Sequence, residues 1–399
     1  MLCGVGMFAI LSSTMSKTPV LPLFAKSLGV TDEILGMVAA ASTIVGIVVS
    51  MPAGALSDIF GRRAVLLTAM FVFATAPVLY LFVNSAGALV AVRVYHGFST
   101  AIFGPVAMAY VADLTKARRA ERMGWYSSAT LVGRSVAMTL GGVLLSVTSY
   151  HSVYVACAVA GFLALGCALA LPGPARPVDG AAEAREKPKI MRQISEGLSA
   201  VGHSRVILIT SIVEAMQYLA FGAVEIFLPL YMKAQGISPW EMGIILGAQI
   251  VTLALTKPLS GRTSDKLGRR PVIAAGLLLN AVALVGLTLS PHFWGFLIWA
   301  TVFGLAMSVV TASTSALVAD VSRAKHYGTS LGVLSSVMDV GHASGPIITG
   351  FVLGTLQYAG TYRALAGLMI VAMVVFAFAT GGIERELGAT LDAEGESEA

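Results

Sequence analysis

Several ionisable side chains lie inside long apolar stretches of this 399-residue chain, where charge is costly, and seven of them are candidates for a site. They are Lys17, Arg93, His96, Arg134, Glu214, Glu225 and Asp339. A charge at the centre of a bilayer costs at least about 2.5 kcal/mol, and such residues usually pair with one another or face a polar cavity. Histidine can also titrate near neutral pH. The set therefore has the chemistry to bind an ionic solute and to take up and release protons.

The elements that carry these residues are predicted to be membrane-spanning helices. The chain is 56% hydrophobic and 12% charged, whereas a soluble domain has about 25% charged residues. Segments 135–175 and 271–319 contain no Asp, Glu, Lys or Arg, and a crossing needs about 20 apolar residues. With the turn signals, the sequence predicts twelve helices at about 2–25, 33–56, 64–83, 87–112, 122–147, 151–171, 204–232, 239–261, 271–290, 292–318, 327–354 and 360–382.

The chain also contains one unit twice. The decapeptide GALSDIFGRR at Gly54–Arg63 returns 207 residues later as GRTSDKLGRR at Gly261–Arg270. The same offset relates Asp113 to Asp320. A fixed internal period indicates a duplicated structural unit, and in membrane proteins a solute site often lies between two such halves. We therefore expect an all-α membrane protein with two pseudo-symmetric six-helix bundles.

The repeat predicts how the ionisable residues meet. Lys17 falls one residue from the repeat equivalent of Glu225, which predicts an ion pair between the halves. Glu214 and Glu225 are 11 residues apart, about three helical turns, and so share a helix face. Arg134 and Asp339 each lie near the middle of their predicted helices. The expected result is one cavity lined by these five residues; the alternative is that the charges only neutralise one another structurally.

Charge predicts the orientation and the domain boundaries. Nineteen Lys and Arg residues fall in segments on one side of the membrane, against three on the other, so both termini are expected in the cytoplasm. The N-terminal bundle is expected at 1–171 and the C-terminal bundle at 204–383. A cytoplasmic linker at 172–203 and an acidic tail at 384–399 complete the chain. No basic leader precedes the first apolar run, so no signal peptide is expected.

The repeated decapeptides resemble the signature of the major facilitator superfamily between helices 2 and 3, and its echo between helices 8 and 9. The likeness covers essentially the whole chain, although Ile59 replaces a basic residue that Lys266 keeps. Glycines there permit a tight turn and close helix approach. The resemblance implies a cytoplasmic gate latch; a topology-setting turn is the alternative. The residues concerned are Gly54, Asp58, Gly61, Arg62, Arg63 and Asp113, with Gly261, Asp265, Gly268, Arg269, Arg270 and Asp320.

A second motif lies at Arg93, which is followed by His96 and Gly97. It resembles the superfamily's Arg-x-x-Gln-Gly motif, with His96 in place of Gln. The resemblance implies that Arg93 takes part in proton coupling; the alternative is a structural arginine bonded to backbone carbonyls. His96 is equally well explained as a packing residue.

A third motif is incomplete. Antiporters of the superfamily carry Gly-Pro-x-x-Gly-Gly on helix 5, but here only the pair Gly141-Gly142 is present. Gly345-Pro346 stands at the repeat-equivalent place, and Asp339 just before it also resembles the drug-efflux branch. The missing Gly-Pro pair weakens the case for antiport.

The resemblance as a whole implies a secondary active transporter that works by alternating access. We expect proton-coupled efflux of drug-like compounds across the bacterial inner membrane, by a monomer whose partners are a small-molecule substrate, protons and the lipid bilayer. One alternative is a dedicated carrier for one metabolite, siderophore or small ion, which the mixed charges favour. A second is a non-transporting receptor or assembly factor on the same fold, which has little need of gate motifs.

Other classes of function find no support in the sequence. No nucleotide-binding loop, haem ligand pair or zinc pattern occurs, so no metal or cofactor is expected. Neither the linker nor the tail is long enough for a catalytic domain, so the chain is not expected to be an enzyme. Basic residues do not cluster with aromatic ones, so nucleic-acid binding is not expected. Cys3, Cys157 and Cys167 lack metal-ligand spacing and are interpreted as packing residues.

Overall fold

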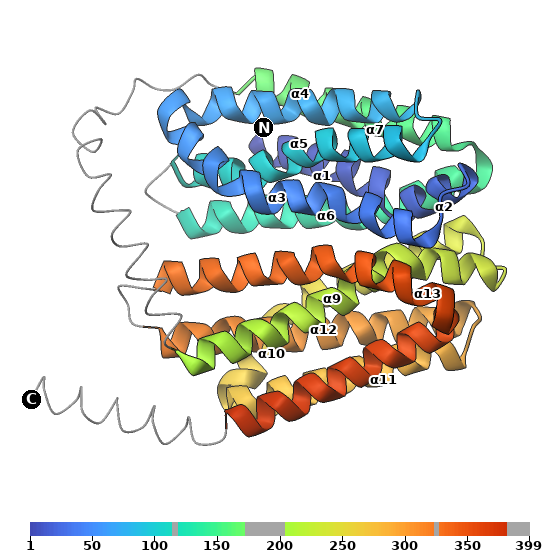
Figure 1. Cartoon of the computed structure of the whole chain (residues 1–399). Helices are drawn as coiled ribbons and strands as arrows, with labels where there is room; N and C mark the ends of the chain where they lie inside the picture. Colours follow the sequence, from blue (N-terminus) through green and yellow to red (C-terminus); the bar gives the residue numbers. More distant parts are fainter. Residues whose placement is uncertain (114–118, 172–203, 323–326, 381–399) are drawn as a thin grey trace, which may run out of the picture.

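The computed structural model describes residues 1–113, 119–171, 204–322 and 327–380, and within these ranges all the regular elements are helices (Figure 1). The expected linker at 172–203 and the acidic tail at 384–399 lie outside the described residues. The first half contains α1 (Leu2–Lys17), α2 (Val20–Ser27), α3 (Asp32–Phe60), α4 (Arg62–Tyr80), α5 (Ala86–Asp113), α6 (Arg119–Val147) and α7 (Tyr150–Leu169). The second half contains α9 (Arg205–Ala234), α10 (Pro239–Leu267), α11 (Arg269–Leu289), α12 (Phe293–Val321) and α13 (Tyr327–Ala379).

These helices confirm the twelve predicted crossings. Ten described helices are long and apolar enough to span a membrane, and one of them, α13, contains two crossings because Gln357 leaves the helical conformation. The first predicted crossing is split into α1 and α2 at Pro19. Proline has no backbone N–H, so it cannot continue the hydrogen-bond ladder of a helix.

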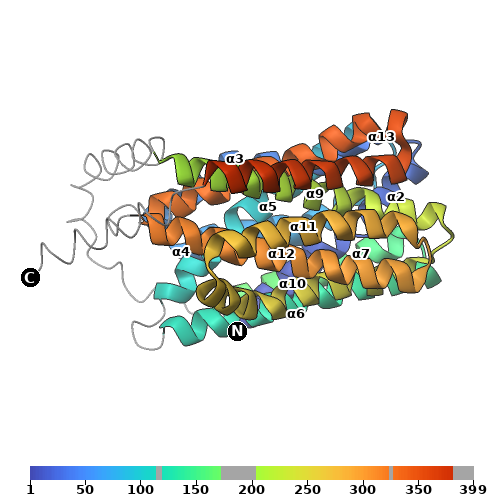
Figure 2. The same cartoon turned by 90° about the horizontal axis from the view of Figure 1, so that it is seen from below.

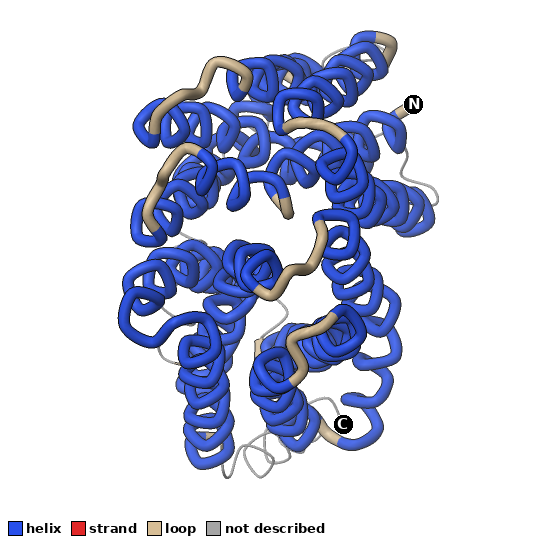
Figure 3. Tube along the Cα trace, turned by 90° about the vertical axis from the view of Figure 1, so that its right-hand side faces the viewer, coloured by secondary structure: helices blue, strands red, loops and turns tan. Residues whose placement is uncertain are grey.

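The helices pack as two bundles, one from each half of the sequence. Within the first half α3 packs on α5, α4 on α7 and α1 on α6; within the second, α9 packs on α13 and α10 on α12. The most extensive contacts between the halves are those of α3 with α13 and of α6 with α10, and α2 also contacts α9. The long helices of both halves run side by side along a common direction (Figure 2), and the view along this direction shows the two groups of helices (Figure 3).

Glycines permit close contact between the halves where α3 meets α13. A Cβ atom on Gly36 would lie 2.3 Å from the carbonyl oxygen of Pro346, and one on Gly350 would lie 2.5 Å from that of Asp32. Real Cβ atoms do not approach so closely, so the two backbones touch only because glycine has no side chain.

The repeat-related contact, between α6 and α10, is built in the same way. A Cβ atom on Gly142 would lie 2.3 Å from the carbonyl oxygen of Pro239, and one on Gly243 would lie 2.7 Å from that of Met138. Gly36 and Gly243 are repeat equivalents, 207 residues apart. Both contacts lie toward the start of α3 and α10, and we call this end of the molecule the contact end.

The opposite end, which carries the loops at Gly61 and Gly268, is called the motif end. Gly54 and Gly261 lie near it, and among the described residues no atom lies within 4 Å of a Cβ atom built on either. The close helix approach expected of these two glycines is therefore not found in the described part of the structure. The expected turns are found, with φ 87° and ψ 137° at Gly61 and φ 90° and ψ 149° at Gly268.

These two turns give a stability prediction. A side chain at such a positive φ costs about 1–3 kcal/mol, so Gly61→Ala and Gly268→Ala should each lower the free energy of unfolding by that amount. Gly54→Ala and Gly261→Ala are the controls, because they lie inside helices with free space around them and should be neutral or stabilising by up to about 1 kcal/mol. Thermal unfolding of the four purified variants measures this, and equal midpoints would contradict it.

Candidate functional site

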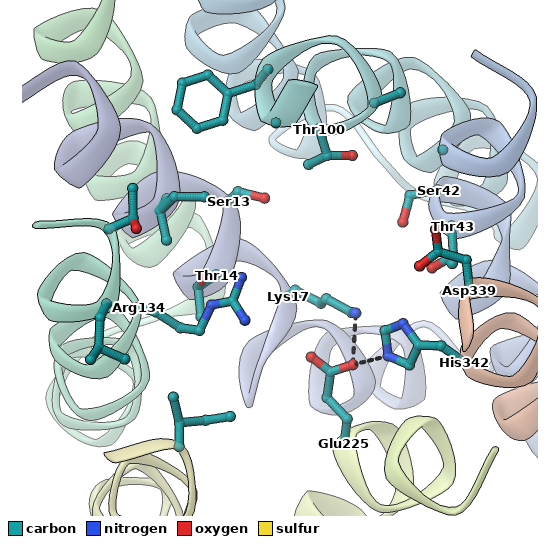
Figure 4. A pocket seen from close by; sticks show the side chains of 18 of the residues that line it. Ser13, Thr14, Lys17, Ser42, Thr43, Thr100, Arg134, Glu225, Asp339 and His342 are labelled. Atoms are coloured by element: carbon teal, nitrogen blue, oxygen red, sulfur yellow. Dashed lines mark hydrogen bonds and ion pairs between the residues drawn. The ribbon is translucent and has the colours of Figure 1, made fainter. Parts of the chain in front are cut away.

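A cavity of about 720 Å³ lies between the two halves. Helices α1, α3, α5 and α6 contribute to its lining from the first half, and α9, α10, α12 and α13 from the second. Figure 4 shows part of this lining. Six of the seven predicted site residues line it, and the exception is Glu214. The six are Lys17, Arg93, His96, Arg134, Glu225 and Asp339.

Three ionisable side chains form a linked group in this cavity. The Nζ atom of Lys17 lies 2.7 Å from Oε2 of Glu225, which confirms the predicted ion pair between the halves. Nε2 of His342 lies 2.9 Å from the same oxygen. All three side chains keep 14–19% of their surface exposed, so the group is accessible from the cavity. His342 is not among the predicted site residues, although it lies 208 residues after Arg134 and so within one residue of its repeat equivalent.

Arg134 and Asp339 also face the cavity, one from each half. Figure 4 shows them on opposite sides of it, with Lys17, Glu225 and His342 between them. Among the described residues neither side chain has an ion pair or a side-chain hydrogen bond. An unpaired cation and an unpaired anion in one membrane cavity are therefore available to a charged solute.

Arg93 lies at the wall of the cavity but is held by the protein. Its side chain is 3% exposed, with Nε 3.4 Å from the carbonyl oxygen of Val38 and Nη2 3.3 Å from that of Ala39. It also donates to the hydroxyl of Ser42. These contacts fasten α5 to α3, which is the geometry of the structural alternative. A role in proton coupling stays a prediction.

His96 is buried one turn further along α5. Its side chain is 1% exposed, and neither ring nitrogen has a hydrogen-bond partner within the described ranges. The imidazole packs edge-on against Phe73, at 5.8 Å between ring centres, and against Tyr80, at 6.0 Å. These contacts suit a packing residue, while its place in the cavity wall keeps the proton-binding prediction open.

Glu214 does not line the cavity, which corrects the expectation that it shares this site with Glu225. The two residues do lie on one helix, but α12 packs against the part of α9 that carries Glu214. The Glu214 side chain is 0% exposed, and its Oε2 atom lies 2.8 Å from the hydroxyl of Thr314 on α12. Helical spacing predicts a common face but not which neighbouring helix covers it.

The two halves of the cavity wall differ in chemistry. The first half supplies a set of hydroxyl groups, and the second supplies mainly apolar and aromatic side chains beside Glu225, Asp339 and His342. The hydroxyl-bearing residues are Ser13, Thr14, Ser42, Thr43, Ser50, Thr100, Ser127 and Thr130. Sequence reasoning missed this wall, since serine and threonine are uncharged and common in membrane helices.

The signature residues at the motif end form the same clamp in each half. Nε of Arg62 lies 3.1 Å from Oδ2 of Asp113, tying α4 to α5. Nε of Arg269 lies 2.9 Å from Oδ2 of Asp320, tying α11 to α12. Asp265 also pairs with Arg269.

The second arginine of each motif binds another helix of its own half. Nη2 of Arg63 donates to the carbonyl oxygen of Leu169 at 2.8 Å, and Nη2 of Arg270 donates to that of Ala377 at 3.2 Å. The side chain of Asp58 lies outside the described part of the structure. That these residues latch a gate stays a prediction.

Two repeated helical bundles with an ionic cavity between them are an architecture typical of membrane transporters. The sequence model of the Major Facilitator Superfamily matches residues 2–251 and 210–397. The chain therefore belongs to this superfamily of transporters.

Known proteins show how far the likeness extends. The chain is 24% identical over 361 residues to "Uncharacterized MFS-type transporter MJ1560" of Methanocaldococcus jannaschii, covering 90% of this chain and 92% of that one. It is 26% identical over 162 residues to "Quinolone resistance protein NorA" of Staphylococcus aureus, covering 39% of this chain and 42% of NorA. The crystal structure of the nucleoside transporter NupG superposes with a TM-score of 0.81 and 13% identity, covering 95% of this chain and 100% of that one. At that identity the superposition shows the fold alone.

Proposed function

We propose that this transporter exchanges protons for small drug-like solutes and moves those solutes out of the cell. The observation that carries the proposal is the cavity between the halves, in which Glu225 and Asp339 face a mixture of cations and apolar side chains. Carboxyl groups in such a place can bind either a proton or a solute, so the two compete. The partial likeness to a quinolone resistance protein adds support for drug-like solutes.

The direction of access follows from the contacts between the halves. The halves touch through Gly36 and Gly243 at the contact end, whereas at the motif end no atom of the described residues lies within 4 Å of a Cβ atom on Gly54 or Gly261. The excess of Lys and Arg supports placing the motif end, with both termini, in the cytoplasm. In this orientation the structure is an inward-open state, and the closed end faces outward.

A second candidate function is a dedicated carrier for one polar, charged metabolite. The hydroxyl-bearing wall and the unpaired residues Arg134 and Asp339 favour it, because together they offer hydrogen bonds and two opposite charges to a single solute. A hydrogen bond to a charged group contributes about 1.5–3 kcal/mol, which corresponds to about ten- to a hundredfold in affinity. No observation on the described residues favours a receptor or assembly factor.

The test is solute flux in liposomes with an imposed pH gradient. For exchange of drug-like solutes we expect gradient-driven movement of several lipophilic cations, and in Asp339→Asn we expect the initial rate to fall by about tenfold or more. Glu33→Gln is the control, because this carboxyl lies outside the cavity. Movement of only one ionic metabolite would select the dedicated carrier. Flux that ignores the gradient would contradict proton coupling.

A further inference from the structure

Glu214 is a carboxyl group for which the cavity gives no account. It is completely buried between α9 and α12, and it has no ion pair in the ranges that the structure describes. The titratable or charged groups near it are Tyr218 on α9 and Lys257 on α10, and beside Tyr218 lie Arg134 on α6 and Asp339 on α13. Helix α12 contributes the hydroxyls of Thr311 and Thr314. An uncompensated carboxylate in such surroundings is very costly.

Hydrogen bonding indicates how this cost is avoided. Oγ1 of Thr314 lies 2.8 Å from Oε2 of Glu214, 3.0 Å from the carbonyl oxygen of Val310 and 3.2 Å from that of Thr311. The hydroxyl has one proton, while carbonyl and carboxylate oxygens only accept. Threonine inside a helix commonly donates to the carbonyl four residues earlier. The hydroxyl can donate to only one of these three oxygens at a time. When it donates to the carbonyl oxygen of Val310, Glu214 keeps its hydrogen bond with Thr314 by carrying a proton and donating it.

Polar side chains link this buried acid to the cavity. Thr311 lies beside both Glu214 and Tyr218. Tyr218 lines the cavity, and its ring packs edge-on against that of His342, with 6.3 Å between ring centres. His342 in turn contacts Glu225. Side chains on α9, α12 and α13 therefore form a continuous series of contacts. It runs from Glu214, in the core of the second half, to Glu225 in the ion pair that joins the halves.

We propose that Glu214 is a proton-binding site, separate from the solute cavity, and that it carries a second coupling proton beside the one that competes with solute at Glu225 and Asp339. It takes one proton from water on one side of the membrane and releases it to water on the other, and Tyr218 is the group through which the site meets the cavity. Thr314 accepts the hydrogen bond of the protonated acid. This inference rests on the proposed proton coupling, but the state of Glu214 can be measured without any solute.

The first experiment is infrared spectroscopy of the full chain in lipid nanodiscs at neutral pH. We expect a C=O stretching band of a protonated carboxylic acid that is lost in Glu214→Gln and retained in Glu225→Gln. Thr314→Val keeps the size of the side chain but removes the acceptor, so the band should move to higher frequency. In Tyr218→Phe the band should remain. Its shift in deuterated water, which reports exchange of the carboxyl proton with solvent, should be slower, because Tyr218 links the site to the cavity.

Two outcomes would overturn the proposal. One is a C=O band that is unchanged in both Glu214→Gln and Thr314→Val. If Glu214→Gln does not fold, an unchanged band in Thr314→Val alone would show that the band does not come from Glu214. The other is loss of the band when sodium replaces choline in the buffer, which would make the site a metal-cation site. In liposomes, Glu214→Gln should still exchange solute downhill, and its transport rate should depend less steeply on the pH gradient than that of the wild-type chain. If the wild-type chain ignores the gradient, proton coupling is wrong, while the infrared result still stands for Glu214.

Discussion

Glu225→Gln should abolish gradient-driven transport and weaken the contact between the halves. The substitution leaves Lys17 and His342 facing each other without the carboxylate that both of them contact. Removing one partner of a fully buried ion pair costs about 3–5 kcal/mol. Because these side chains keep 14–19% exposure, we expect about 1–3 kcal/mol here. Thermal unfolding measures the stability change, and flux in liposomes measures the loss of transport.

The matched variant removes both charges. Lys17→Met together with Glu225→Gln leaves no uncompensated charge, so this double variant should recover most of the lost stability. It should not recover transport, because the carboxyl group that exchanges ligands is still absent. Full transport by either variant would show that the Lys17–Glu225 pair only holds the halves together.

Gly36→Val and Gly243→Val should stop the contact end from closing and should lower transport by about tenfold or more. A Cβ atom at either position would lie within 2.3–2.7 Å of a backbone carbonyl oxygen of the other half. Backbone cannot move aside as a flexible side chain does, so the halves must separate there. A tenfold lower rate requires only that the conformation closed at the contact end be destabilised by about 1.4 kcal/mol relative to the conformation that is open there. Gly54→Val is the control variant. Gly54 lies at the motif end, so this substitution should leave the conformation that is closed at the contact end undisturbed.

Spin-label distances would report the change directly. Labels at Ser27 and Gln235, exposed at the contact end of the two halves, should move apart in Gly36→Val. Labels at Ile59 and Leu267, exposed at the motif end, should come closer as the molecule opens on the other side. Unchanged distances at both ends would show that the glycine contacts are passive packing and do not set the conformation.

The membrane-spanning helices could be predicted because their signal is local. Long charge-free segments and the loops between them fix the crossings, and α5 at Ala86–Asp113 differs from its predicted range of 87–112 by one residue at each end. The division of the first crossing into α1 and α2 at Pro19 was not predicted, although Pro19 is visible in the sequence. Its effect depends on the neighbours that replace the lost hydrogen bond.

The site was only partly predictable, because it depends on which helices meet. The repeat located Lys17 opposite Glu225, since equivalent positions face each other across the axis between the halves. The sequence did not show that α12 covers Glu214. Helical spacing predicts which residues share a face of α9, but it does not predict which helix packs against that face. His342 was not selected because, unlike His96, it lies in none of the recognised motifs, and its place in the site comes from the contact with Glu225.

The two clamps at the motif end have a consequence for how the chain is made. Arg62 pairs with Asp113 and Arg269 pairs with Asp320, so each clamp is complete within its own half. During synthesis the first bundle can close its clamp before residue 204 has been added, as domains generally fold in order from the N-terminus. The Lys17–Glu225 pair, by contrast, must wait for α9. Assembly of this transporter then has two stages, the folding of each bundle and the later docking of one bundle on the other.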